Sequence, residues 1–159
     1  MNWNEESREN TVYGDSRTFV IEGDAVAKAR PRIRRDGRTY TPKKTVEYEQ
    51  KVRGAYREVY PDAEVIDEAL ELTVTFFVKI PQSWSKTKQE QARAGVIMPT
   101  SRPDVDNLIK PITDALNGIC YVDDSQIIGI DAMKRYSDFP RTEVLLKKIK
   151  GRSGTWRWL

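Results

Sequence analysis

The chain has 159 residues and a formal net charge of +3, which predicts one domain with a sizeable hydrophobic core. It contains no histidine and one cysteine, so histidine general bases, histidine-bound zinc, Ser-His or Cys-His nucleophile pairs and an internal disulfide are excluded. No apolar run approaches the roughly 20 residues of a membrane span, and the polar start lacks a signal-peptide pattern, so we expect a soluble cytoplasmic protein without membrane contact.

The first third of the chain predicts a strand and a helix on either side of a basic segment. Residues 1–16 are polar and show no periodicity, so we expect them to be disordered. Residues 17–22 suit a strand, because β-branched and aromatic side chains are bounded there by a Gly-Asp turn. A helix is expected to begin with Thr45 as its N-cap and to end at Pro61, since apolar residues between them recur at helical spacing.

Residues 28–44 concentrate the positive charge, with a net charge of +7 against −4 for the rest of the chain. Asp36-Gly37 is typical of a hairpin turn, and a hairpin would hold the arginines in place for phosphate contacts. A solvated charge run is the more common explanation of basic stretches in general. We favour nucleic-acid binding, because a separate phosphate site is indicated further along the chain. The candidate DNA-binding residues here are Arg30, Arg32, Arg34, Arg35, Arg38, Lys43 and Lys44.

The remaining elements predict a mixed sheet. Residues 70–80 alternate apolar and polar side chains, which is the pattern of a strand with one buried face. A short polar helix is expected to begin after Ser83 or Ser85, and two further strands are expected at residues 127–136 and 143–149. We therefore predict a single-domain α/β fold of the α+β type, in which helices pack against a mixed β-sheet.

Residues 102–126 contain five aspartates and one lysine in a predicted helix and the loop after it. They are Asp104, Asp106, Lys110, Asp114, Asp123 and Asp124. Apolar residues have helical spacing until Asn117-Gly118 ends the helix, although Pro111 should bend it. Lys110 lies four residues from both Asp106 and Asp114, so the three share one helix face. Clustered carboxylates without imidazole or thiolate suit a hard cation, which predicts a magnesium site and chemistry on phosphate.

Each of these residues taken alone has a structural explanation. Asp104 or Asp106 would more often be a helix cap or a partner of the helix dipole. The two adjacent aspartates would more often form a solvated turn, and Lys110 would be a surface partner of a structural Asp114. The combination is more specific, because Asp-x-Asp-Asn-x-x-Lys is followed by Asp-Ala-Leu-Asn-Gly and then by Asp-Asp-Ser-Gln.

The chain resembles the RusA-type endodeoxyribonucleases, which are Holliday junction resolvases of bacteria, prophages and phages. The resemblance rests on Arg-Pro-Asp-Val-Asp-Asn-Leu-Ile-Lys at 102–110, Asp-Ala-Leu-Asn-Gly at 114–118 and Val-Asp-Asp-Ser-Gln-Ile at 122–127. Ala-Arg-Pro-Arg at 29–32 and Tyr-Thr-Pro-Lys-Lys-Thr at 40–45 support it. It implies a RusA-like nuclease domain at residues 17–150, between the N-terminal segment 1–16 and a basic, aromatic tail at 151–159.

The resemblance also implies catalytic roles. Asp104, Asp106 and Asp124 match the metal-binding catalytic aspartates, and Lys110 matches the lysine required for cleavage. Asp123 matches a neighbouring motif position, which we take as a further metal ligand. Mg²⁺, with Mn²⁺ as a substitute, would activate water for in-line attack on the phosphorus, and Lys110 would stabilise the developing negative charge.

The implied partners are branched DNA and a second copy of the chain. Members of the family cut four-way junctions by paired symmetric nicks as homodimers, and Asn107 matches a motif position that we take as a DNA contact. The expected setting is recombination and repair in a bacterial cell, from a phage or prophage gene.

Two other functions stay open from the sequence. The chain could be a catalytically silent protein that binds branched DNA, or a magnesium-dependent DNA nuclease with less selectivity for DNA structure. In the tail, Trp156 and Trp158 could stack on unpaired bases or pack against the protein, and we favour neither.

Overall fold

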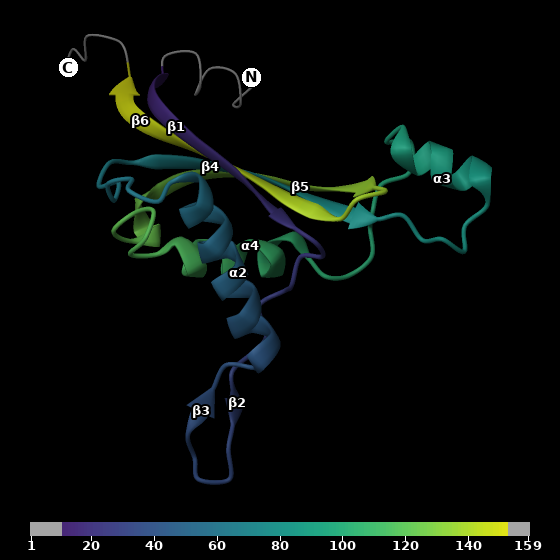
Figure 1. The fold of residues 1–159 in the computed structure, drawn as a ribbon, viewed down its shortest axis with the longest axis horizontal. Coiled ribbons are helices and arrows are strands. Elements are labelled where there is room, and N and C mark those ends of the chain that lie inside the picture. Colours follow the sequence, from purple (N-terminus) through teal and green to yellow (C-terminus); the bar gives the residue numbers. More distant parts are fainter. Residues whose placement is uncertain (1–10, 153–159) are drawn as a thin grey trace, which may run out of the picture.

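A four-stranded mixed β-sheet forms the centre of the fold in the computed structural model, which describes residues 11–152 (Figure 1). The strand order is β1-β6-β4-β5, with bounds Thr11–Glu22, Arg141–Arg152, Leu70–Lys79 and Ile127–Ser137. β4 pairs in parallel with β5 and antiparallel with β6, and β6 pairs antiparallel with β1. The predicted α+β fold with a mixed sheet is therefore confirmed.

Helices α2 (Lys43–Val59) and α4 (Val105–Leu116) pack on the same face of the sheet and cover the hydrophobic core (Figure 1). The predicted alternation along β4 is confirmed, because every second side chain from Leu70 to Phe76 is buried. The helices contribute side chains three or four residues apart, as amphipathic helices do. The buried core residues of these three elements are Leu70, Leu72, Val74, Phe76, Tyr48, Val52, Tyr56, Leu108, Ile112, Ala115 and Leu116.

Two small elements extend from this body. Strands β2 (Arg32–Ile33) and β3 (Thr39–Tyr40) form a hairpin that projects beyond the N-terminal end of α2 (Figure 1). Helix α3 (Lys86–Arg93) lies beyond one end of the sheet and is capped by Ser85, whose hydroxyl accepts a hydrogen bond from Lys88 N. The guanidinium of Arg93 contacts both carboxylate oxygens of Asp138, at 2.7 and 2.9 Å, and so ties α3 to the turn between β5 and β6.

Two local expectations were wrong. Residues 11–16 were expected to be disordered, but they belong to β1 because their backbone pairs with the far end of β6, a contact that local sequence patterns do not encode. Thr45 was expected to cap α2, but the helix begins after Pro42. Thr45 is buried instead, and its hydroxyl accepts a 3.4 Å hydrogen bond from Ala29 N.

Residues 1–10 and 153–159 lie outside the described residues, so the expectations for the first ten residues and for Trp156 and Trp158 stay predictions. Within residues 11–152, the helices are all too short or too polar to cross a membrane.

Candidate active site

The first turn of α4 presents two exposed aspartates. Asp104 occupies the N-cap position with extended backbone angles, φ −72° and ψ 151°, and its side chain makes no capping hydrogen bond. Asp106 lies in the first helical turn. The partial positive charge of the helix N-terminus favours carboxylates at both positions. The carboxylate of Asp104 therefore does not make the hydrogen bond to the helix N-terminus that an N-cap aspartate usually makes.

Lys110 lies one turn further along α4, between two carboxylates. Its Nζ is 2.8 Å from Asp114 Oδ1 and 3.3 Å from Asp124 Oδ2. The hydrogen bond with Asp114, supported by the one with Asp124, raises the pKa of Lys110. Lys110 is thus a fixed positive charge at neutral pH. The predicted shared face of Lys110 and Asp114 is confirmed by their contact.

A short 3₁₀ helix, η1 (Asp124–Gln126), brings the second acidic pair to α4. Asp123 caps η1, because its side chain accepts from Ser125 N while Gln126 Oε1 accepts from Asp123 N at 2.8 Å. Hydrogen bonds with the Asp124 carboxyl and then with Ser125 lower the pKa of Asp123. Asp123 therefore has a structural task in addition to any role as a ligand.

Three hydrogen bonds, made by Gln126 and Tyr121, hold the segment from the end of α4 to η1 in place. Gln126 Nε2 donates to Ile66 O at 3.0 Å and to Glu68 O at 2.9 Å. The hydroxyl of the buried Tyr121 donates to Thr113 O at 2.7 Å, which attaches the loop to α4. Together these contacts determine where the Asp124 carboxylate stands relative to the helix.

Asp106, Lys110 and Asp124 line one hollow of about 280 Å³ between α4, η1 and β5. Ile109, Thr113, Ile127 and Ile130 complete its lining. Asp104 and Asp123 are not among the lining residues. The structure thus gathers three of the five residues that the sequence assigned to catalysis or metal binding.

The donor set of this hollow fits a hard divalent cation. Within residues 11–152, no group of three or more His, Cys, Asp or Glu side chains is close enough to hold a metal ion on its own. Two carboxylates do face the same hollow, and Mg²⁺ commonly takes one or two carboxylates, with water and substrate phosphates as its other ligands. A Mg²⁺ ion bound together with a phosphate is compatible with that arrangement.

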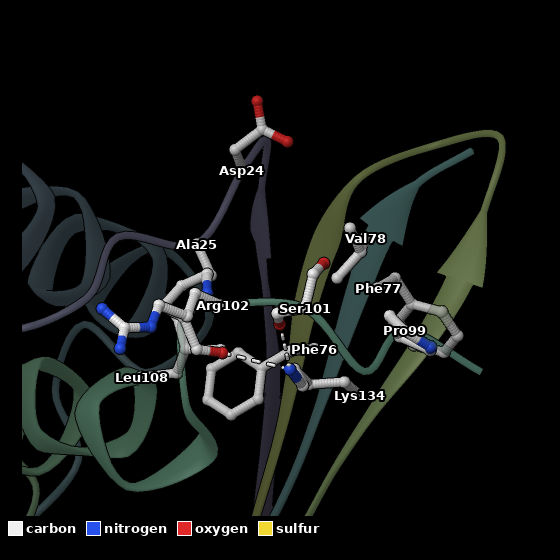
Figure 2. Close-up of a pocket in the computed structure, with 11 residues that line it drawn as sticks. Asp24, Ala25, Phe76, Phe77, Val78, Pro99, Ser101, Arg102, Leu108 and Lys134 are labelled. Carbon is white, nitrogen blue, oxygen red and sulfur yellow. Dashed lines mark hydrogen bonds between the residues drawn. The ribbon is translucent and has the colours of Figure 1, made fainter. Parts of the chain in front are cut away.

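Lys134 is a residue whose importance the sequence did not indicate. Its Nζ donates to Ser101 O at 2.7 Å and to Pro103 O at 3.1 Å, from β5 across to the loop before α4 (Figure 2). These contacts form one side of a second hollow of about 190 Å³, which Phe76 and Leu108 also line. Lys134 thereby holds the backbone that leads directly into Asp104.

Pro111 also shapes the site, because it has no N–H to donate to the carbonyl of Asn107 one turn earlier. That carbonyl instead accepts a 2.8 Å hydrogen bond from Lys28 N. The ammonium of Lys28 reaches Glu49 Oε1 at 2.6 Å and Asp114 Oδ2 at 2.9 Å. Lys28 is therefore docked on α4 and α2, although it begins the basic segment.

The expected DNA-binding residues of the basic segment are all exposed. Arg32 pairs with Tyr40 across the hairpin, and the Arg34 guanidinium lies 5.4 Å from the centre of the Tyr40 ring. Gly37 has φ +79°, which a hairpin turn of this kind requires and which glycine adopts without strain. The segment thus presents its positive charges on a projecting structure (Figure 1).

Comparison with known proteins finds similarity over most of the described residues. A family model described as "Endodeoxyribonuclease RusA" matches residues 22–147, which include the hairpin, α4 and η1. The uncharacterised protein YqaN of Bacillus subtilis (strain 168) is 35% identical over 136 residues, covering 82% of this chain and 95% of that protein. The crossover junction endodeoxyribonuclease rusA of Lactococcus phage r1t is 36% identical over 83 residues, covering 50% of this chain and 55% of the phage protein.

Proposed function

Because the chain belongs to the RusA family of endodeoxyribonucleases, we propose that it resolves four-way DNA junctions by paired, metal-dependent nicks. The observation that carries the proposal is the shared hollow of Asp106, Lys110 and Asp124, which combines an oxygen donor set with a fixed positive charge. The partial match to a phage crossover junction endodeoxyribonuclease supports the choice of substrate. Such an activity would serve DNA recombination and repair in a bacterial cell or a phage.

The proposed metal is Mg²⁺, with Mn²⁺ as a substitute, and the proposed ligands are Asp106 and Asp124 with Asp104. These residues would hold Mg²⁺, which would supply Lewis-acid chemistry toward a water molecule and the phosphate. The chain has no histidine that could act as a general base, which favours a metal for this task. The negative charge of these carboxylates repels a phosphate anion until a cation offsets it.

Lys110 is proposed to stabilise the negative charge that develops on the scissile phosphate. A preorganised ammonium is effective in this role because it needs no reorganisation when charge develops. Its hydrogen bonds with Asp114 and Asp124 already hold the side chain across the hollow. The same contacts keep its pKa raised, so the charge is present throughout the physiological pH range.

The hairpin and the start of α2 are proposed to bind the phosphate backbone on the flank of the site. Arg30, Arg32, Arg34, Arg35, Arg38, Lys43 and Lys44 are exposed, and Asn107 lies in the exposed first turn of α4. Arginine binds phosphate with two parallel hydrogen bonds, and its charge gives affinity that falls steeply with salt.

The active form is proposed to be a homodimer. A four-way junction that is cut symmetrically on two strands calls for two active sites related by a two-fold axis. Helices α2 and α4 pack on one face of the sheet (Figure 1). Side chains alternate between the two faces of a strand, so Phe77 of β4, which is half-buried and follows the core residue Phe76, belongs to the other face. That face is a candidate for the contact between subunits.

The test is cleavage of labelled four-way junctions, flaps, forks and linear duplex by the wild type and by Asp106→Asn. We expect the wild type to nick the junction in Mg²⁺ and to be inactive in EDTA, and Asp106→Asn to bind the junction without nicking it. Asp62→Asn, which removes an exposed carboxylate outside the hollow, is the matched control and should cut normally. Equal cutting of linear duplex would contradict junction selectivity, and cleavage in EDTA would contradict the metal.

A further inference from the structure

A continuous chain of ion pairs links the base of the basic hairpin to Lys110. Glu49 of α2 contacts Lys28, Lys28 contacts Asp114, Asp114 contacts Lys110, and Lys110 contacts Asp124, with N–O distances of 2.6, 2.9, 2.8 and 3.3 Å. Asp114 uses one carboxylate oxygen for each lysine. Neither Lys28 nor Asp114 lines the hollow, so the proposed cleavage reaction assigns them no task.

This chain differs from an ordinary surface ion pair. The side chains of Lys28, Asp114 and Glu49 are 27%, 24% and 13% exposed, whereas an exposed pair in α2, Lys43 with Glu47, has 88% and 58%. Reduced exposure limits screening by solvent and limits the freedom of the side chains. The contacts among these three residues are therefore better shielded from solvent than the exposed pair, whereas Lys110, near the other end of the chain of ion pairs, is 54% exposed.

The backbone of Lys28 is anchored independently of its side chain. Its N–H donates to the carbonyl of Asn107, which is available because Pro111 has no N–H to offer it. Lys28 is thus attached to α4 at two points, one in the first turn of the helix and one at Asp114. This double attachment fixes the ammonium of Lys28 beside Asp114.

The two ion pairs of Lys110 indicate how Asp114 affects the position of the Lys110 ammonium. The Lys110 ammonium is closer to Asp114 than to Asp124, at 2.8 against 3.3 Å. Without the Asp114 carboxylate, the nearest remaining anion would be Asp124, and Lys110 would move toward it. A tight pair of Lys110 with Asp124 would occupy the carboxylate that the proposed metal needs and would withdraw the charge from the phosphate.

We propose that Asp114 and Lys28 are positioning residues that hold Lys110 across the hollow and keep Asp124 available for the metal. Asp114 restrains Lys110 directly, and Lys28 acts through Asp114. The inference rests on the proposed function, because it assigns a task to the lysine of that cleavage site. It also connects the DNA-binding hairpin to the reaction, since Lys28 lies between the hairpin and α4.

The experiment measures single-turnover cleavage of a four-way junction and, separately, junction binding in EDTA. We expect Asp114→Asn and Lys28→Met to slow cleavage by about ten- to hundredfold, as misplacement of a catalytic group does, with Kd for the junction unchanged. Lys28→Arg keeps a cation beside Asp114 and should restore most of the rate. Lys51→Met removes an exposed lysine of α2 and should cleave like the wild type.

A second readout reports on Lys110 without any cleavage. The ¹³C relaxation of the Lys110 Cε group, assigned from its loss in Lys110→Arg, should show a restrained side chain in the wild type and a mobile one in Asp114→Asn. Unchanged cleavage in Asp114→Asn, or slower cleavage with an equally restrained Lys110, overturns the positioning role. A matching loss of junction binding also overturns it. A wild type that cuts no DNA instead refutes the proposed function, and this inference falls with it.

Discussion

Replacing Gln126 by alanine tests how η1 positions Asp124. The amide of Gln126 takes part in three hydrogen bonds, with Asp123 N at 2.8 Å, Ile66 O at 3.0 Å and Glu68 O at 2.9 Å. A hydrogen bond contributes roughly 0.5–1.5 kcal/mol net. Water can replace part of these contacts because Gln126 is half-buried. We therefore expect Gln126→Ala to lower the free energy of unfolding by about 2 kcal/mol.

That loss corresponds to a Tm about 4–8 °C lower for a domain of this size, which differential scanning calorimetry measures directly. The cleavage rate should fall as well, since Asp124 follows the cap that Gln126 completes. Junction binding should persist, because the exposed arginines of the hairpin are untouched.

Gln126→Glu separates two roles of Gln126, which completes the cap of η1 and also donates hydrogen bonds to the carbonyls of Ile66 and Glu68. A capping box accepts glutamate as readily as glutamine, so a role in capping alone predicts an unchanged Tm. In this structure the second carboxylate oxygen of the glutamate would replace Gln126 Nε2 and face the carbonyl oxygens of Ile66 and Glu68. A carboxylate oxygen has no proton to donate to them, so both hydrogen bonds would be lost. We expect Gln126→Glu to be at least as destabilising as alanine at neutral pH. A Tm equal to that of the wild type in both variants would refute the reasoning.

Three further predictions concern charge, packing and pH. Replacing Arg32, Arg34 and Arg35 together by alanine should reduce the slope of log Kd against log salt concentration by about 2–3, because each phosphate contact contributes roughly 0.9 to this slope. The Tm should not change, and an unchanged slope would refute the phosphate contacts. Tyr121→Phe should cost about 1–2 kcal/mol in urea denaturation, since it removes a buried hydrogen bond to α4; no loss would show that this bond does not anchor the loop. Burial raises the pKa of Asp114, but hydrogen bonds from Lys110 and Lys28 outweigh burial and lower this pKa below its ordinary 3.8. The contribution of the ionised Asp114 carboxylate to stability is therefore complete above about pH 5. The difference in stability between wild type and Asp114→Asn should therefore narrow as the pH falls through and below 3.8, and a constant difference down to pH 2 would contradict the shift.

Local patterns in the sequence predicted the elements that form the core. The alternation of residues 70–80 corresponds to β4, and the apolar spacing after Asp104 corresponds to α4. Such periodicity is visible because each buried side chain repeats with the period of its own strand or helix. The predicted bend at Pro111 stays a prediction, but the carbonyl of Asn107, to which this proline has no N–H to donate, accepts a hydrogen bond from Lys28 N.

Contacts between distant segments were not predictable in the same way. The parallel pairing of β4 with β5, the strand order and the start of β1 at Thr11 depend on partners far along the chain. Thr45 has the side chain of a good N-cap, but tertiary packing buries it against Ala29 instead. Local propensity is a weak prior wherever such packing competes.

The site was predictable in its residue types but not in its geometry. The spacing of four residues placed Lys110 on one face with Asp106 and Asp114, as the structure has it for the lysine and Asp114. The resemblance already matches Asp124, and not Asp123, to a catalytic aspartate. The structure adds a physical reason, because Asp123 caps η1 while Asp124 lines the hollow. The hydrogen bonds of Lys134 were not predictable, because they join β5 to a loop more than thirty residues earlier in the chain.

The most direct test of junction resolution is the digestion of a supercoiled plasmid that extrudes a cruciform. Two symmetric nicks across the four-way junction convert such a plasmid into a linear molecule, whereas single nicks give only open circles. We expect linear product with the wild type in Mg²⁺ and none with Asp106→Asn or in EDTA. Open circles without linear product, or equal nicking of a plasmid without the cruciform, would contradict it.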